Sequence, residues 1–343
     1  MATWQQQFDW PGVGKDVNAR YGNALDLQLG RDMHCWQAPN TFYGPVTACY
    51  VSNYGPAPFD SINQVENPMW PNLEEAVDEA IDSLPLPSIT PFATVAMVYA
   101  PNGIGTNKDQ VTFYVFDQTG NLLDNAALDG EGFKSVPRMC MTCHGGAYLT
   151  STHSVTAAQG GHISSFLPFD VYGFYYSQKI SGHGLDDQQE SFRQLNNLVL
   201  TTNPNPAIAN LINGLYSGNV ATPGTTILGD SYVPSAWSAN PTLYKGVFRK
   251  YCRMCHIAQD SPSDFSTLAE FGRVDVEPQF VCGYGGGGGG GVMPHAEVPF
   301  GGLAGSTKFS GLGVGFWWDF TAISDMNSFL DQGGNNPFPC KQP

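Results

Sequence analysis

The sequence predicts an α+β protein, in which a β-rich N-terminal domain is followed by mainly helical regions. Short β-type runs separated by Gly, Pro and Asn fill the first 135 residues. Apolar residues at helical spacing replace them further along the chain. A Pro/Ser/Gly-rich span at 220–241 is typical of a connection between domains. We therefore expect a β-rich domain at 1–135, a region with helices at 136–224 and a third region at 225–343.

Three runs in the N-terminal domain have the composition of strands. They are TACYVSN (47–53), ATVAMVY (93–99) and VTFYVF (111–116), and β-branched and aromatic residues are frequent in them. The turn DQTGN at 117–121 follows the last run, as it would in a hairpin. These signals predict a β-rich domain with few helices.

Helical periodicity marks the rest of the chain. The run 185–200 carries apolar residues on one face and begins with acidic residues, which favour a helix start. A second helix is expected from Pro206, in its first turn, to Gly218. A third helical run covers 242–256.

Charge and hydropathy exclude some classes of partner. Of the 343 residues 13% are charged, and the formal net charge is -15. Nucleic acids and anionic membranes need Lys and Arg to neutralise phosphates, so neither is an expected partner. No stretch approaches the roughly 20 apolar residues that span a bilayer. The first ten residues also lack the pattern of a secretory signal, which a mature chain would have lost.

A five-residue pattern, Cys-x-x-Cys-His, occurs at 140–144 and again at 252–256. This pattern attaches c-type haem: each Cys forms a thioether with one vinyl group, and the His binds iron. With eight Cys and seven His in the chain, about 0.004 chance matches are expected. Two covalently bound haem c groups are therefore predicted. The attachment residues are Cys140, Cys143 and His144 for haem 1, and Cys252, Cys255 and His256 for haem 2.

Two other chemistries use closely spaced cysteines. A zinc site would need a further Cys or His pair at matching spacing, and it is the main alternative to haem. A redox dithiol would need one Cys-x-x-Cys beside a βαβ pattern and no histidine. The repeated histidine favours haem over both.

The last hundred or so residues resemble a class I cytochrome c domain. A helical run leads into the second motif, a short helix-like run follows at 264–272, and 322–332 fits the last helix of that family. The family often uses a Met followed by Pro as the sixth iron ligand, and Met293 fits that place. His295, two residues on, is the rival ligand because imidazole also binds haem iron.

The first motif departs from that family. Pro137 precedes it, so no long helix can lead into it, and two glycines after His144 end any helix there. Its sixth ligand must come from the opposite face of the haem. His34 is favoured because its neighbour Cys35 can be held by a disulfide, and His162 because it lies in a Gly-flanked loop. The other candidates are His153 and His183.

Four cysteines lie outside the motifs: 35, 49, 282 and 340. Haem attachment of this kind takes place on the oxidising side of a membrane, where spare cysteines commonly pair. Of the three possible connectivities, Cys35 with Cys49 and Cys282 with Cys340 keep each bridge inside one domain. The expected location is thus periplasmic or extracellular.

These features predict a di-haem c-type cytochrome that carries electrons between redox partner proteins outside the cytoplasm. They favour an electron carrier over an enzyme. One alternative is a di-haem peroxidase-like enzyme with one open haem site, although 139 residues precede the first motif here, whereas in that family it lies near the N-terminus. Another is a subunit of an extracellular electron-conducting filament, with self-assembly. No catalytic residue is assigned.

Overall fold

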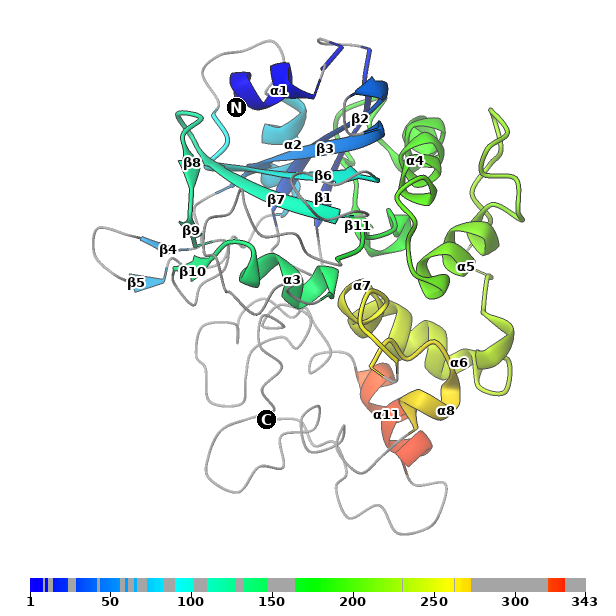
Figure 1. The fold of residues 1–343 in the computed structure, drawn as a ribbon. Coiled ribbons are helices and arrows are strands. Elements are labelled where there is room, and N and C mark those ends of the chain that lie inside the picture. Colours follow the sequence, from blue (N-terminus) through cyan, green and yellow to red (C-terminus); the bar gives the residue numbers. More distant parts are fainter. Residues whose placement is uncertain are drawn as a thin grey trace, which may run out of the picture.

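The computed structural model shows an α+β fold whose N-terminal part is built on a seven-stranded antiparallel sheet (Figure 1). It describes residues 1–8, 10–11, 15–23, 29–41, 44–55, 59–60, 65–66, 73–82, 90–101, 110–127, 133–146, 164–229, 231–261, 263–272 and 320–330. The strands, in spatial order, are β11 (Phe174–Tyr175), β1 (Val17–Asn23), β2 (Gly30–Thr41), β3 (Gly44–Tyr54), β6 (Ala93–Ala100), β7 (Gln110–Asp117) and β8 (Leu122–Leu123).

The three predicted strands are β3, β6 and β7, which lie next to one another inside this sheet. The predicted hairpin joins β7 to β8, where the Asp117 carboxylate accepts hydrogen bonds from the backbone N–H groups of Thr119 and Asn121. Two short strand pairs flank the sheet. They are β4 (Phe59–Asp60) with β5 (Val65–Glu66), and β9 (Asn125–Ala126) with β10 (Lys134–Ser135).

The two faces of the sheet differ in what covers them. One face packs against α1 (Ala2–Gln7), and there Ala96 and Val98 of the central strand β6 are fully buried beside Trp4. On the opposite face Val95 and Met97 of the same strand are only half-buried. Figure 1 shows the first motif helix, α3 (Arg138–His144), on that second side of the sheet.

Two further helices confirm the predictions for the middle of the chain. The helix α4 (Leu185–Leu200) has the predicted bounds, and its Asp187 carboxylate accepts the N–H of Gly184 at the N-terminus. The next helix, α5 (Pro206–Leu215), begins at the predicted proline, is capped by the Asn205 side chain and ends before the predicted Gly218. Their apolar faces join the core beneath the sheet.

The C-terminal part is helical and is organised by aromatic side chains. The predicted run 242–256 is helical throughout, but it divides into α6 (Pro241–Leu243), the π-helical segment η3 (Tyr244–Cys252) and α7 (Arg253–His256). Beside it lie α8 (Leu268–Phe271) and α11 (Phe320–Leu330), which correspond to the predicted short and last helices (Figure 1). Their common core includes Trp237, Tyr244, Phe248, Phe265 and Phe271.

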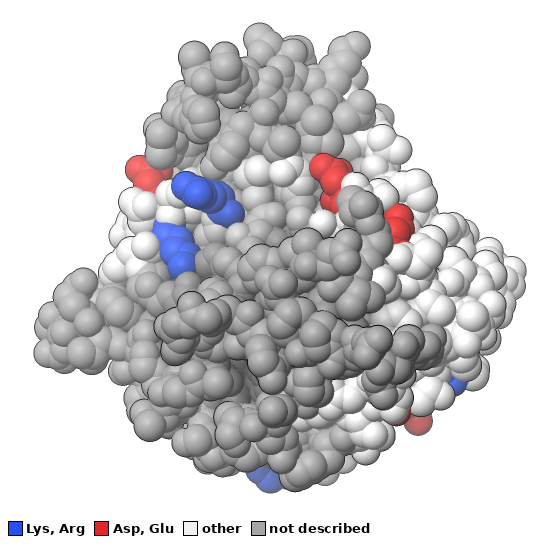
Figure 2. All heavy atoms as spheres, turned by 90° about the horizontal axis from the view of Figure 1, so that it is seen from below, with Lys and Arg blue, Asp and Glu red and all other residues white. Residues whose placement is uncertain are grey.

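The remaining described elements are short connections and one amphipathic helix. They are α2 (Leu73–Asp82), which packs on β1 to β3, and the 3-10 turns η1 (Val171–Gly173) and η2 (Ser235–Trp237). Among the described residues no helix is long and apolar enough to cross a membrane. On the face shown in Figure 2, the described Lys, Arg, Asp and Glu side chains lie in small separate groups among uncharged ones.

Candidate haem-attachment site

The first motif forms a short helix with abrupt ends. Helix α3 starts directly after Pro137 and stops at Gly145, whose φ of 65° lies in the left-handed region that glycine tolerates. This confirms that no long helix leads into the motif. The short helix presents Cys140, Cys143 and His144 to a cavity below the sheet.

The His144 side chain is held in one protonation state and one orientation. Its Nδ1–H donates to the backbone carbonyl of Ser165 at 2.9 Å, because a carbonyl oxygen can only accept. Burial, together with a smaller effect of the charge of Arg31, lowers the pKa of His144 to about 4. The neutral ring therefore carries its proton on Nδ1 and leaves the Nε2 lone pair for a metal. The ring packs in a T-shaped arrangement with Phe113, with centroids 5.3 Å apart.

The second motif repeats this arrangement in a different setting. It begins at the end of η3 and continues through α7. The His256 Nδ1–H donates to the carbonyl of Ser263 at 2.7 Å, and burial lowers the pKa of His256. The ring stacks on Phe265 with centroids 4.5 Å apart. Both motif histidines thus use Nδ1 for a backbone carbonyl and keep Nε2 as the potential metal ligand.

The two motifs touch each other. The Sγ atoms of Cys143 and Cys255 lie 3.4 Å apart, although 112 residues separate them in the sequence. The Gln259 side-chain amide donates to the carbonyl of Thr142 at 2.8 Å. A Cβ atom at Gly145 would lie 2.0 Å from the carbonyl oxygen of Ala258, so only glycine permits this approach.

A buried ion pair fixes the second motif against the rest of the molecule. Arg253, in the spacer between Cys252 and Cys255, is 2% exposed and donates from Nε and Nη2 to the two carboxylate oxygens of Asp170, at 2.8 and 2.7 Å. Its Nη1 donates to the hydroxyl of Tyr244 at 2.6 Å. A bidentate pair of this kind fixes direction as well as distance. The ion pair therefore sets where the second motif lies relative to the first.

Two of the motif thiols, those of Cys140 and Cys252, are uncharged in this environment. Burial raises the pKa of Cys140 to about 12, with a further contribution from Cys143, and burial raises the pKa of Cys252 to about 12. None of the four motif cysteines is in a disulfide. They are available for bond formation with another group.

A cavity of about 220 Å³ separates the first motif from the sheet. Its floor is the half-buried face of the sheet described above, and Phe166, Phe169 and Phe174 add further apolar wall. Met254 and Cys255 of the second motif also line it. The sheet residues that form this floor include Arg31, Met33, Val51, Val95 and Met97.

His34, the expected sixth ligand of haem 1, does not line this cavity. Its Nδ1 lies 2.6 Å from Asp16 and its Nε2 lies 3.1 Å from Asp32, so both ring nitrogens are engaged by carboxylates. Burial alone would lower its pKa, but hydrogen bonds to Asp16 and Asp32 and their charges outweigh burial and raise the pKa of His34 to about 9. The ring stacks on Tyr50 at 4.7 Å.

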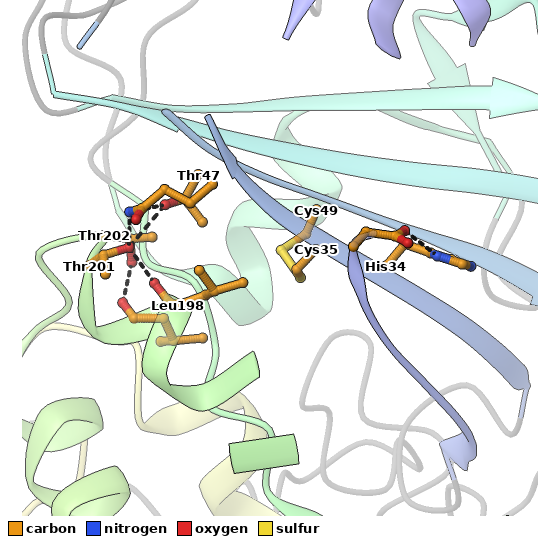
Figure 3. The surroundings of a disulfide bond; sticks show 10 residues. His34, Cys35, Thr47, Cys49, Leu198, Thr201 and Thr202 are labelled. Atoms are coloured by element: carbon orange, nitrogen blue, oxygen red, sulfur yellow. Dashed lines mark hydrogen bonds and ion pairs between the residues drawn. A yellow bond between two sulfur atoms is a disulfide. The ribbon is translucent and has the colours of Figure 1, made fainter. Parts of the chain in front are cut away.

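The predicted disulfide between Cys35 and Cys49 is present and joins directly paired residues of β2 and β3. Figure 3 shows the His34 ring pointing away from this disulfide. Cys49 lines the cavity, so the bridge belongs to its floor. The disulfide therefore positions the strand that carries His34 without bringing His34 to the first motif.

Other predicted site residues lie elsewhere. His183 precedes α4 and does not line the cavity. Met293, His295, His153, His162, Cys282 and Cys340 lie outside the described residues.

Sequence reasoning did not find the floor of the cavity. Met97 and Met33 face the first motif from strands that lie far from it in the sequence, and Arg253 carries a buried ion pair. The alternation of β6 could have assigned Met97 to one face of the sheet, but no local signal says that a motif packs on that face. Among the described residues, no three His, Cys, Asp or Glu side chains converge as ligands of a metal ion would.

Comparisons with protein-family models, with curated proteins and with solved structures found no match to this chain.

Proposed function

We propose that this protein is a di-haem c-type cytochrome that transfers electrons between redox partners on the oxidising side of a membrane. The observation that carries the proposal is the shared state of the two motif histidines, which are neutral and hydrogen-bonded through Nδ1 to backbone carbonyls. That is the state in which an imidazole Nε2 binds haem iron. Bound haem supplies reversible one-electron exchange at its iron.

The residues around the first motif fit such a group. Cys140 and Cys143 would carry the thioether bonds and His144 the iron, beside a cavity whose walls are mostly apolar. Typical ligand pockets have about 300–1,000 Å³, so a whole porphyrin needs more room than the 220 Å³ present. Seating it requires the half-buried side chains of the wall to move apart.

The contact between the motifs supports electron exchange within the protein. Groups bonded to Cys143 and Cys255 would be neighbours, because these sulfur atoms lie 3.4 Å apart. The Arg253–Asp170 pair and the Gln259–Thr142 hydrogen bond hold that proximity in place. An electron could thus enter at one motif and leave at the other.

The C-terminal region, 225–343, is proposed to be cytochrome c-like, with Cys252, Cys255 and His256 as haem 2 residues and Met293, or else His295, as its sixth ligand. The helices η3 to α7, α8 and α11 around one aromatic core support this proposal. The Cys35–Cys49 disulfide supports a periplasmic or extracellular location, since such bonds persist in oxidising compartments.

Haem attachment is tested by mass and by metal content. Expression in a host that attaches c-type haem should yield a chain with the mass of two haems, which denaturation and acid-acetone extraction do not remove. The pair Cys140→Ala with Cys143→Ala should remove one haem, and the pair Cys252→Ala with Cys255→Ala should remove the other. The matched control, Cys35→Ala with Cys49→Ala, should keep both. The mass of the bare polypeptide, or zinc in place of iron, would contradict the proposal.

A further inference from the structure

We infer that the thioether of Met97, in the floor of the cavity, is the sixth ligand of the iron that His144 holds. The inference rests on the proposed haem attachment. It names the sixth ligand of haem 1, for which the sequence left several candidates. It concerns the side of haem 1 that faces the sheet.

The side chains of strand β6 that face the cavity are less buried than those on its other face. β6 lies inside the sheet, between β3 and β7, and its Ala96 and Val98 are fully buried on the face next to α1. Val95 and Met97 alternate with them and are only half-buried, because the cavity lies over them. An apolar group held by the first motif would cover both side chains.

Few residue types can bind haem iron. Opposite the first motif, the described cavity wall contains tyrosine, cysteine and methionine residues of this kind. Val51 and Val95 carry no donor atom, and Cys49 is in the disulfide. Burial, then the charges of Asp16 and Asp32, raise the pKa of Tyr50, so its phenol stays protonated. Tyr21 lies on β1, which is farther than β2 from the strand that carries Phe113. Neutral thioethers need no deprotonation to bind iron.

Four methionines line the cavity, and their positions separate them. Met139 directly precedes Cys140 on the helix that also carries His144, so it would approach a bound haem from the same side as that histidine. Met254 lies in the spacer of the second motif. Met33 and Met97 come from the sheet, opposite the motif.

The strand register favours Met97 over Met33. Phe113, whose ring meets His144, is directly paired with Met97 across β6 and β7. Side chains of a directly opposed pair lie about 5 Å apart. Met33 is on β2, three strands from β7, which places it about 14 Å from Phe113 at the usual strand spacing. The flexible Met97 side chain therefore lies within reach of the space beside His144.

The test uses the haem-loaded full-length protein and a matched pair of variants. Met97→Leu and Met33→Leu make the same change on the same cavity floor, and neither leucine can bind iron. Each is made in a Met293→Ala background, so that a near-infrared band of Met-ligated ferric haem reports haem 1. Met97→Leu should abolish that band, lower the reduction potential of haem 1 and convert it to a high-spin form. Met33→Leu should keep the near-infrared band and the low-spin form, because Met33 lines the cavity without binding the iron in this assignment.

A second variant separates ligation from packing. Met97→His should keep haem 1 low-spin, because imidazole also binds iron, while the near-infrared band disappears and the potential falls. A purely structural methionine would not give that combination. This variant also keeps the test valid where Met97→Leu fails to fold.

Three outcomes would overturn the assignment. The first is a near-infrared band that survives in both Met97 variants. The second is the loss of that band in Met33→Leu. The third is the loss of low-spin character at haem 1 in His162→Ala or His34→Ala. A high-spin, cyanide-binding haem 1 in the unmodified protein would also overturn it and favour an open-site enzyme. Each of these results requires covalent haem, so they differ from failure of the proposed function, in which no haem is attached.

Discussion

The first motif lies on a seven-residue helix below a β-sheet, whereas the second continues a helical run inside an aromatic cluster. His144 packs in a T-shaped arrangement with Phe113 from the sheet, and His256 stacks on Phe265 from a neighbouring loop. Both rings nevertheless make the same Nδ1 hydrogen bond to a backbone carbonyl. The same five-residue pattern therefore gives both histidines the same hydrogen bond, while the surrounding fold decides which side chains lie around each motif.

The two settings are also stabilised differently. The first is held by strand pairing and by the Cys35–Cys49 disulfide in the cavity floor. The second is held by aromatic packing and by the buried Arg253–Asp170 pair, which reaches back to the first region. Variants of these contacts should therefore separate the two motifs experimentally.

The largest effect is expected at the buried ion pair. Asp170→Asn keeps the shape of the side chain but leaves the guanidinium of Arg253 buried without its counter-charge, which should cost about 3 to 5 kcal/mol of unfolding free energy. Denaturant unfolding measures this loss. The control Asp78→Asn removes the carboxylate next to Lys179, whose side chain is 62% exposed, and should cost less than about 1 kcal/mol. Equal losses of unfolding free energy in the two variants would contradict the inference that the Arg253–Asp170 pair fixes the position of the second motif.

The next effect concerns the floor of the first motif. Cys35→Ala with Cys49→Ala opens a loop with a sequence separation of 14 and should lower the unfolding free energy by about 3 kcal/mol. Denaturant unfolding with and without a reductant checks this value, because reductant should destabilise the parent and not the variant. A parent that is insensitive to reductant would show that the bridge is absent or inaccessible.

The face of the sheet away from the motif should give a pH signature. The pKa of His34 is raised to about 9 from an ordinary 6.5, so the folded state binds its proton more tightly than the unfolded state does. This stabilisation is fully present below about pH 6.5 and is lost as pH rises to about 9, with a total of up to about 3 kcal/mol.

The measurement is unfolding free energy from pH 6 to 9.5 in the parent and in His34→Gln. The parent should lose its advantage over the variant as the pH rises, because only the parent carries the titrating ring between Asp16 and Asp32. Curves that stay parallel across this range would argue against a charged His34.

The smallest effect tests the contact between the motifs. Gly145→Ala and Gly182→Ala both place a side chain at positive φ, 65° and 83°, but only the first meets a neighbour, the carbonyl of Ala258. Gly145→Ala should therefore cost about 2 kcal/mol more than Gly182→Ala. In the haem-loaded protein it should also weaken the magnetic coupling between the two irons, measured by electron paramagnetic resonance. Unchanged coupling would mean that the contact does not set the distance between the two sites.

The sequence by itself determined the local features of this protein. Alternation and turn residues predicted β3, β6 and β7, helical spacing predicted α4 and α5, and Pro137 and the two glycines predicted the short first-motif helix. The repeated pattern also named all six predicted attachment residues. These signals are local, because they depend on neighbours within one or two turns or on strand periodicity.

Contacts between residues that are distant in the sequence depend on the tertiary structure. The contact of Cys143 with Cys255, the Arg253–Asp170 pair and the position of Met97 above the first motif all join residues that are distant in the sequence. His34 illustrates the difference: its nearness to a disulfide was visible in the sequence, but the face of β2 on which it lies depends on strand register and places it between two carboxylates. A shift of one residue in that register would have turned it to the other face, which is why sequence reasoning could not place it.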